Sequence, residues 1–175
     1  WEADAGVAIV MDVETGAIRA ISNLGRTESG YYAEDYNYAV GRSSEPGSTF
    51  KLMSALVMLE DGHVALDDEI IVNGGKRQFY DRWMKDSELH GEHTMPFKDV
   101  FKKSSNVGMA SAAFDAYGKN SQSHIAFFNA LKKTGVMEKT GIEIAGEPKP
   151  FFKDPSDENP ETGHHWYGTT VPWMA

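Results

Sequence analysis

A chain of 175 residues with a hydrophobic fraction of 41% is long enough for one globular domain or a piece of a larger one, and too short for two full cores. A formal net charge of −9, without clustered Lys and Arg, argues against a nucleic-acid partner and against an anionic membrane surface. The chain has no cysteine, which excludes disulfides, Cys-ligated zinc and a thiol nucleophile.

The N-terminal residues 6–22 predict a β-hairpin with one buried face. Apolar residues alternate with their neighbours, and a period of two is typical of a half-buried strand. The alternating residues are Val7, Ile9, Met11 and Val13. Residues 14–16 (Glu-Thr-Gly) predict the turn, because glycine readily takes positive φ. From residue 23 to residue 46 we expect a long irregular connection.

Residues 48–60 predict a helix that is buried on most of its faces. Pro46 and Gly47 break the preceding segment, and Ser48 is a favoured residue at a helix N-terminus. The residues that follow are apolar on nearly every side, and Gly62 is expected to cap the C-terminus. The purely apolar run of residues 56–59 is far too short to span a bilayer.

The rest of the chain predicts helices separated by polar, turn-rich segments. We expect helices over residues 96–102, 106–117 and 124–133, a short strand at 70–72, and an exposed loop over 147–163. In the last helix, Ile125, Phe128 and Leu131 share the face that should be buried.

Ser48 and Lys51 form a Ser-X-X-Lys tetrad, a pattern short enough to arise by chance. With 13 serines and 12 lysines, about one random match is expected, and the chain holds one. On a helix the two residues share a face, the helix dipole favours negative charge at Ser48, and burial would lower the pKa of the Lys51 amine. Lys51 would then be the base that activates the Ser48 hydroxyl. The alternative is a surface serine cap with a lysine extending into solvent.

Ser104 and Asn106 form a second pattern, Ser-X-Asn, at the break between two predicted helices. A serine there can pass a proton between Lys51 and a leaving amine. An asparagine can hold a substrate amide and a lysine through its donor and acceptor ends. The alternative is an N-cap for the helix that begins near Asn106, and the two roles are compatible.

Four segments, in the same order along the chain, resemble class B penicillin-binding proteins. They are the hairpin of residues 6–23, residues 37–40 with 45–51 (Glu-Pro-Gly-Ser-Thr-Phe-Lys), residues 103–108 (Lys-Ser-Ser-Asn-Val-Gly) and residues 140–147. The resemblance implies an α+β fold of the penicillin-binding and serine β-lactamase-like type, with an N-terminal hairpin and a mostly helical subdomain. Residues 1–175 would be a partial transpeptidase domain that ends before the family's third motif and C-terminal strands.

The implied activity is that of a peptidoglycan D,D-transpeptidase. Ser48 would be acylated by the D-alanyl-D-alanine end of a stem peptide, and the amine of a neighbouring stem would receive the acyl group. Lys51 would take the Ser48 proton, Ser104 would relay it, and Asn106 would orient the substrate. β-Lactams would mimic the dipeptide and leave a slowly hydrolysed acyl-serine. The resemblance implies no cofactor and no metal.

The resemblance also implies partners and a location. The whole protein would be held by a membrane anchor at the extracytoplasmic (periplasmic) face of the bacterial cytoplasmic membrane, with other cell-wall synthesis proteins of the divisome or elongasome. Residues 1–175 alone should react slowly, because one donor of the oxyanion hole would come from a later strand. Copies of them are expected to associate through an open sheet edge.

The family's third motif, Lys-Thr-Gly followed by Thr or Ser, has two imperfect matches. Residues 133–135 and 139–141 read Lys-Thr-Gly, but Val136 and Ile142 follow them. We interpret the first as a helix C-terminus with its glycine cap and the second as part of the segment 140–147. The true motif is expected after residue 175.

Other interpretations remain open. The chain could belong to a β-lactam sensor or a non-catalytic module that binds wall peptides, or to a serine β-lactamase. No residue stands out as the water activator that a β-lactamase needs, and Glu-Pro-Gly before Ser48 favours the transpeptidase. His90 with His93, and His164 with His165, could suggest a metal. They lie in polar loops without a His-Glu-X-X-His helix, so we expect solvated histidines.

Overall fold

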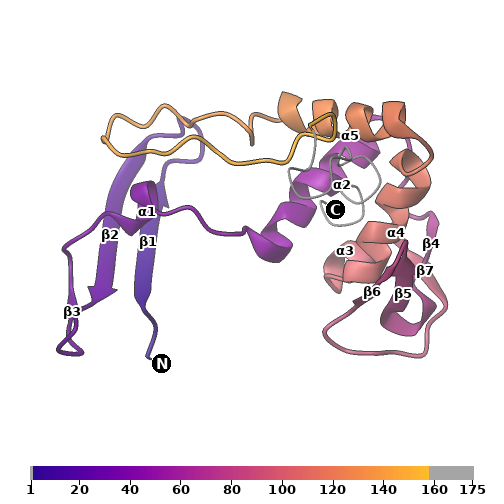
Figure 1. Cartoon of the computed structure of the whole chain (residues 1–175), viewed down its shortest axis with the longest axis horizontal. Helices are drawn as coiled ribbons and strands as arrows, with labels where there is room; N and C mark the ends of the chain where they lie inside the picture. The colour runs from indigo at the N-terminus through magenta and orange to yellow at the C-terminus, as the bar shows by residue number, and fades with distance from the viewer. Residues whose placement is uncertain (1, 158–175) are drawn as a thin grey trace. The chain divides into compact units, whose positions relative to one another are not determined.

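A computed structural model describes residues 2–157 and divides the chain into two compact units (Figure 1). Unit 1 consists of residues 1–45 and 138–150, and unit 2 of residues 46–137 and 151–175. Helices and strands occur in separate stretches, as an α+β chain requires. Within residues 2–157, none of the helices is both apolar enough and long enough to span a bilayer.

Unit 1 contains an antiparallel sheet in the order β1 (Ala5–Met11), β2 (Ile18–Arg26) and β3 (Tyr32–Ala33). The predicted hairpin is confirmed, with Ile9 opposite Ile21. The Asp12 carboxylate accepts the N–H groups of Glu14 and Thr15, and Gly16 has φ +71°. The turn is therefore stabilised by an Asx-type cap as well as by glycine.

The buried face expected for the hairpin is wrong. Val7, Ile9 and Met11 are about half exposed, and Val13 is 95% exposed. Helix α1 (Tyr38–Gly41) packs against β1 and β2, with the Tyr38 ring beside Gly25, but it does not bury the alternating residues of β1. The expected irregular connection is also wrong in part, since β2 continues to residue 26 and β3 and α1 follow.

Unit 2 holds the helices and two small antiparallel sheets, in which β4 pairs with β7 and β5 with β6. The elements are the 3₁₀ helices η1 (Gly47–Phe50) and η2 (Asn73–Gly75), the helices α2 (Lys51–Glu60), α3 (Phe97–Lys102), α4 (Asn106–Tyr117) and α5 (Ser121–Lys133), and the strands β4 (Glu69–Ile71), β5 (Lys76–Phe79), β6 (Arg82–Lys85) and β7 (Thr94–Pro96). The prediction missed the β5–β6 hairpin, because only Phe79 and Met84 mark its buried face.

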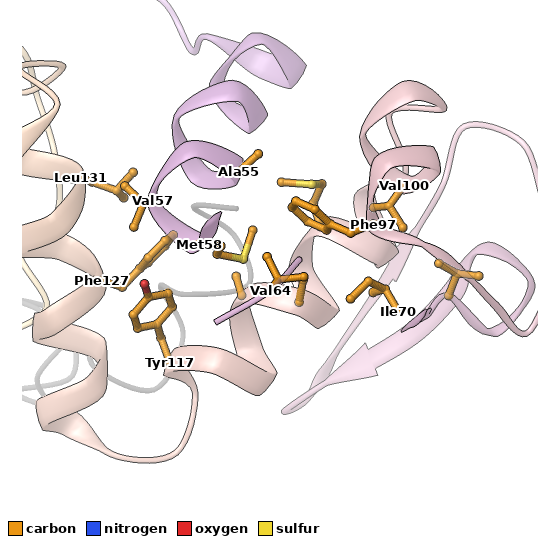
Figure 2. Packing of buried hydrophobic residues seen from close by; sticks show 14 of the residues in the cluster. Ala55, Val57, Met58, Val64, Ile70, Phe97, Val100, Tyr117, Phe127 and Leu131 are labelled. Carbon is orange, nitrogen blue, oxygen red and sulfur yellow. The ribbon is translucent and has the colours of Figure 1, made fainter. Parts of the chain in front are cut away.

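The core of unit 2 lies where α2 meets α4 and α5 (Figure 2). Met58 and Val57 of α2 belong to one buried cluster with Phe127 of α5, and the Phe127 ring lies 4.8 Å from that of Tyr117 in α4. Burying one such side chain contributes roughly 1.5–3 kcal/mol, so this cluster stabilises the packing of α2 against α4 and α5.

All four predicted helices are present, and two of them are corrected in detail. The predicted helices 96–102 and 106–117 correspond to α3 and α4, and the last helix exists but begins at Ser121. The helix begins earlier than predicted because Asn120 is its N-cap and forms a capping box with Ser123. Its buried residues are His124, Phe127 and Leu131, so Leu131 is buried as predicted, whereas Ile125 and Phe128 are only half-buried. On α2, Leu52 and Leu56 are about half exposed, so the helix is buried on fewer faces than expected.

Candidate active site

Lys51 is the first residue of α2, and its side chain is directed into the protein. The residue is only 6% exposed. Burial lowers the pKa of the Lys51 amine, and the negative charge of Asp86 opposes that shift. The alternative in which Lys51 extends into solvent is therefore wrong.

The Lys51 amine lies among three oxygens of the Ser104–Asn106 turn. Nζ donates to the carbonyl oxygen of Ser104 at 2.6 Å and to Oδ1 of Asn106 at 2.6 Å. It also lies 3.1 Å from the hydroxyl oxygen of Ser104. The structure thus brings together three of the four residues singled out in the sequence.

The three contacts accommodate either protonation state of Lys51. An ammonium donates to all three oxygens. A neutral amine keeps two donors for the carbonyl of Ser104 and the amide oxygen of Asn106, which only accept, and offers its lone pair to the Ser104 hydroxyl. The longest contact is therefore the one along which a proton can move between Lys51 and Ser104.

The Ser104–Asn106 turn connects α3 to α4 and has an unusual backbone. Ser104 has φ +54°, a left-handed conformation that non-glycine residues seldom adopt. Ser105 is the N-cap of α4, and its hydroxyl accepts the N–H of Gly108 at 2.8 Å. Asn106 donates through Nδ2 to the carbonyl oxygen of Lys85 at 3.0 Å. The N-cap predicted for this turn is Ser105, which leaves Ser104 and Asn106 free to contact Lys51.

Ser48 lies in η1, one turn before Lys51, and is exposed. Its carbonyl oxygen accepts the backbone N–H of Lys51. Among residues 2–157, no hydrogen bond joins the Ser48 hydroxyl to Lys51, Ser104 or Asn106. The prediction that an α-helix begins at Ser48 is wrong, because residues 47–50 form a 3₁₀ helix and α2 begins at Lys51. Gly47, the first residue of the 3₁₀ helix, has φ +59°.

Asp86 is the residue at this site that sequence reasoning missed. Its side chain is 8% exposed, and its carboxylate accepts hydrogen bonds from Ser105 and Val107. It follows β6 in a polar segment, and a lone aspartate there carries no pattern that would have indicated its role.

The remaining candidates are the histidines and the two Lys-Thr-Gly matches. In the described stretch 2–157, no group of three potential ligands could hold a metal ion, and His164 and His165 lie outside it. Thr134 caps α5 and Gly135 follows with φ +82°, as predicted for the first Lys-Thr-Gly match. The second match lies in a loop, where Lys139 donates to the carbonyl oxygen of Glu147.

A family model described as the penicillin binding protein transpeptidase domain matches residues 6–162. The chain belongs to the penicillin-binding protein transpeptidase family. This confirms the resemblance drawn from the motifs, including the similarity to class B members.

Curated relatives and solved structures agree with the family. The chain is 29% identical over 149 residues to penicillin-binding protein PbpB of Mycobacterium tuberculosis, covering 80% of this chain and 20% of that protein. It is 26% identical over 182 residues to the peptidoglycan D,D-transpeptidase FtsI of Buchnera aphidicola, covering 97% and 30%. A solved peptidoglycan synthetase from Bifidobacterium adolescentis has a TM-score of 0.67 at 23% identity, over 97% of this chain and 31% of that one.

These matches confirm the α+β transpeptidase fold. The chain spans only 20% of the length of PbpB and 30% of the length of FtsI.

Proposed function

We propose that this transpeptidase chain carries the acylating residues of a peptidoglycan D,D-transpeptidase. Ser48 is the nucleophile, Lys51 its base, Ser104 the proton relay and Asn106 a substrate-binding residue. The observation that carries the proposal is the buried Lys51 amine, which contacts both Ser104 and Asn106. A buried amine with a lowered pKa is suited to accept a proton, whereas a solvated lysine is not.

The acylation step follows from these positions. The Ser48 Oγ attacks the carbonyl carbon between the two D-alanines while its proton passes to Lys51. The tetrahedral intermediate collapses with cleavage of the C–N bond, and Ser104 delivers the proton from Lys51 to the leaving amine. Terminal D-alanine departs and an acyl ester remains on Ser48. The amine of a second stem then attacks the ester, forms the cross-link and returns a proton to Ser48.

The Ser48 hydroxyl must approach the Lys51 lone pair for this step. In a neutral Lys51 that lone pair would face Ser104, because the other two amine contacts are to oxygens that only accept. Substrate binding would therefore bring the exposed Ser48 hydroxyl closer to Lys51. Catalytic hydrogen bonds are often long before substrate binds, so the present geometry is compatible with the assignment.

The proposal extends to the whole protein. Its substrates would be peptidoglycan stem peptides, β-lactams would acylate the same serine, and the site would face the extracytoplasmic side of the membrane. Other cell-wall synthesis proteins, such as those of the division machinery, would be its partners. The relative FtsI, named as a peptidoglycan D,D-transpeptidase, supports this extension.

The test is covalent labelling of the full-length protein with a fluorescent penicillin, followed by mass spectrometry of the labelled peptide. We expect the label on Ser48 and none in Ser48→Ala. A label on another residue, or equal labelling of Ser48→Ala, would contradict the assignment. Incubation with stem peptides then separates the alternatives. A transpeptidase releases D-alanine and forms cross-links, a sensor retains the label without turnover, and a β-lactamase hydrolyses the penicillin rapidly.

A further inference from the structure

Asp86 contacts the Ser104–Asn106 turn through two hydrogen bonds. Its Oδ2 accepts the Ser105 hydroxyl at 2.8 Å, and its Oδ1 accepts the backbone N–H of Val107 at 2.9 Å. The two donors flank Asn106 in the sequence. Both carboxylate oxygens are therefore engaged by the turn that supplies the three oxygens around the Lys51 amine.

Asp86 is itself fixed by contacts that do not involve the turn. Its backbone N–H donates to the carbonyl oxygen of Gly75 at 2.9 Å. At the other end of the same loop, Gly74 donates to the carbonyl oxygen of Glu92 at 2.7 Å, and His90 donates to that of Gly74 at 3.1 Å. Gly75 has φ +84°, and a Cβ there would lie 3.3 Å from Asp86 Oδ2. The loop 86–92 is thus tied to η2 at both ends, with Asp86 in close contact with a glycine.

The turn needs such support because its geometry is costly. Ser104 holds a positive φ, and in this conformation its carbonyl oxygen and its hydroxyl both contact the Lys51 amine. Asn106 is held by the same segment, because its Nδ2 donates to the carbonyl oxygen of Lys85, the residue before Asp86. The end of β6 therefore holds three consecutive residues, Ser105, Asn106 and Val107.

We propose that Asp86 is a positioning residue for proton transfer at Lys51, because its carboxylate fixes the Ser104–Asn106 turn in the conformation that surrounds the Lys51 amine. The proposal rests on the function assigned above. It adds a residue that lies outside the two sequence motifs and contacts no reacting atom.

The charge of Asp86 should also affect the pH dependence of acylation. Asp86 raises the pKa of Lys51 against the effect of burial. The nearest other titratable side chain is that of His90, whose Nε2 lies 3.5 Å from Asp86 Oδ2. His90 in turn neighbours Glu92, which Lys103 contacts at 2.9 Å. His90 Nδ1 lies 2.7 Å from Glu92 without hydrogen-bond geometry. Removing the Asp86 charge should therefore lower the pKa of Lys51, and acylation should persist to lower pH.

The experiment measures the rate of acylation by a fluorescent penicillin against pH in the full-length protein. In Asp86→Asn we expect the rate at its optimum to fall roughly tenfold to a hundredfold, the usual loss for hydrogen bonds to a charged group. The low-pH limb of the profile should move to lower pH. Asp86→Glu retains the charge and should be slower without that shift. The matched control is Asp81→Asn, on the exposed β5–β6 turn, and it should behave as wild type.

Thermal unfolding of each variant establishes that it is folded at the assay temperature. A wild-type rate in Asp86→Asn, or a slower rate with an unmoved limb, overturns the proposal. If Asp86→Asn does not fold, Ser105→Ala removes one of the two bonds and leaves the charge. It should be slower with the limb in place, and a wild-type rate would count against the proposal. Failure of the wild-type protein to label at Ser48 would instead reject the proposed function.

Discussion

The Oδ1 atom of Asn106 accepts a hydrogen bond from Lys51 Nζ at 2.6 Å, although the two residues begin different helices, α4 and α2. The contact is short, Lys51 is buried and Asn106 is half-buried. The pKa of Lys51 should therefore depend on the side chain at position 106.

Asn106→Asp should slow acylation at neutral pH. A carboxylate beside Lys51 favours the ammonium, and an adjacent opposite charge typically shifts a pKa by about one to three units. The rate at pH 7 should fall roughly tenfold for each unit, and the low-pH limb of the acylation profile should move to higher pH. The measurement is penicillin labelling against pH. Asn106→Ala is the comparison, since it loses the contact without adding charge and should leave the limb in place. A limb that stays in place in Asn106→Asp would argue against Lys51 as the base.

Lys51→Arg should lose acylation almost completely. The guanidinium retains the positive charge but does not deprotonate in proteins, so it has no lone pair for the Ser48 proton. Loss of a general base typically costs about 10²–10⁴ in rate. Stopped-flow or gel-based labelling of the full-length protein measures the loss. The matched control is Lys102→Arg, an exposed lysine in the last turn of α3, which should label as wild type. Comparable labelling of the two variants would contradict the prediction.

Gly108→Ala should destabilise unit 2, despite the higher helix propensity of alanine. A Cβ at position 108 would lie 2.5 Å from Cγ1 of Val100 and 3.1 Å from the Ser105 hydroxyl oxygen. Val100 is completely buried, so overpacking of about 1–3 kcal/mol should exceed the gain of roughly 1 kcal/mol in propensity. The free energy of unfolding in urea measures the difference. Gly91→Ala, where nothing lies within 4 Å, serves as control. An unchanged midpoint in Gly108→Ala would contradict this packing.

Tyr117→Phe should cost about 1.5–3 kcal/mol of stability, the range for a hydrogen bond to a charged group. The Tyr117 hydroxyl donates to Oδ2 of Asp61 at 2.6 Å, and the residue is 2% exposed. Burial, followed by the hydrogen bond to Asp61 and then the Asp61 charge, raises the pKa of Tyr117 above its ordinary value of 10.0. The folded state therefore resists ionisation more than the unfolded state, and this stability is lost as pH rises above about 10.

Urea unfolding of wild type and Tyr117→Phe at several pH values between neutrality and the alkaline range checks this prediction. The difference between the two proteins should be largest at neutral pH and should shrink above the ordinary tyrosine pKa. Tyr31→Phe, at an exposed tyrosine of unit 1, should leave stability unchanged. A constant difference across the range would show that the ionisation of Tyr117 does not contribute.

Elements with strong local signals were predictable from sequence. The hairpin of residues 6–22 follows from alternation and a glycine turn, and α4 follows from the apolar residues between Ser105 and Gly118. The family also followed from sequence, because its motifs are contiguous and appear in order. In these places the determining interactions lie within a few residues of one another, and such interactions are legible in a linear sequence.

Burial and the contacts of the site were decided by the tertiary structure. The alternating residues of β1 are exposed although their pattern is that of a buried face, because burial depends on which elements pack over a strand. The tetrad places Ser48 and Lys51 together, yet the Lys51 amine contacts residues of a distant turn. Asp86 has no motif, and its role arises only from the fold of β6 against α4. The sequence determined which residues are chemically capable, and long-range packing determined which of them meet, since contacts between distant segments leave no periodicity in the chain.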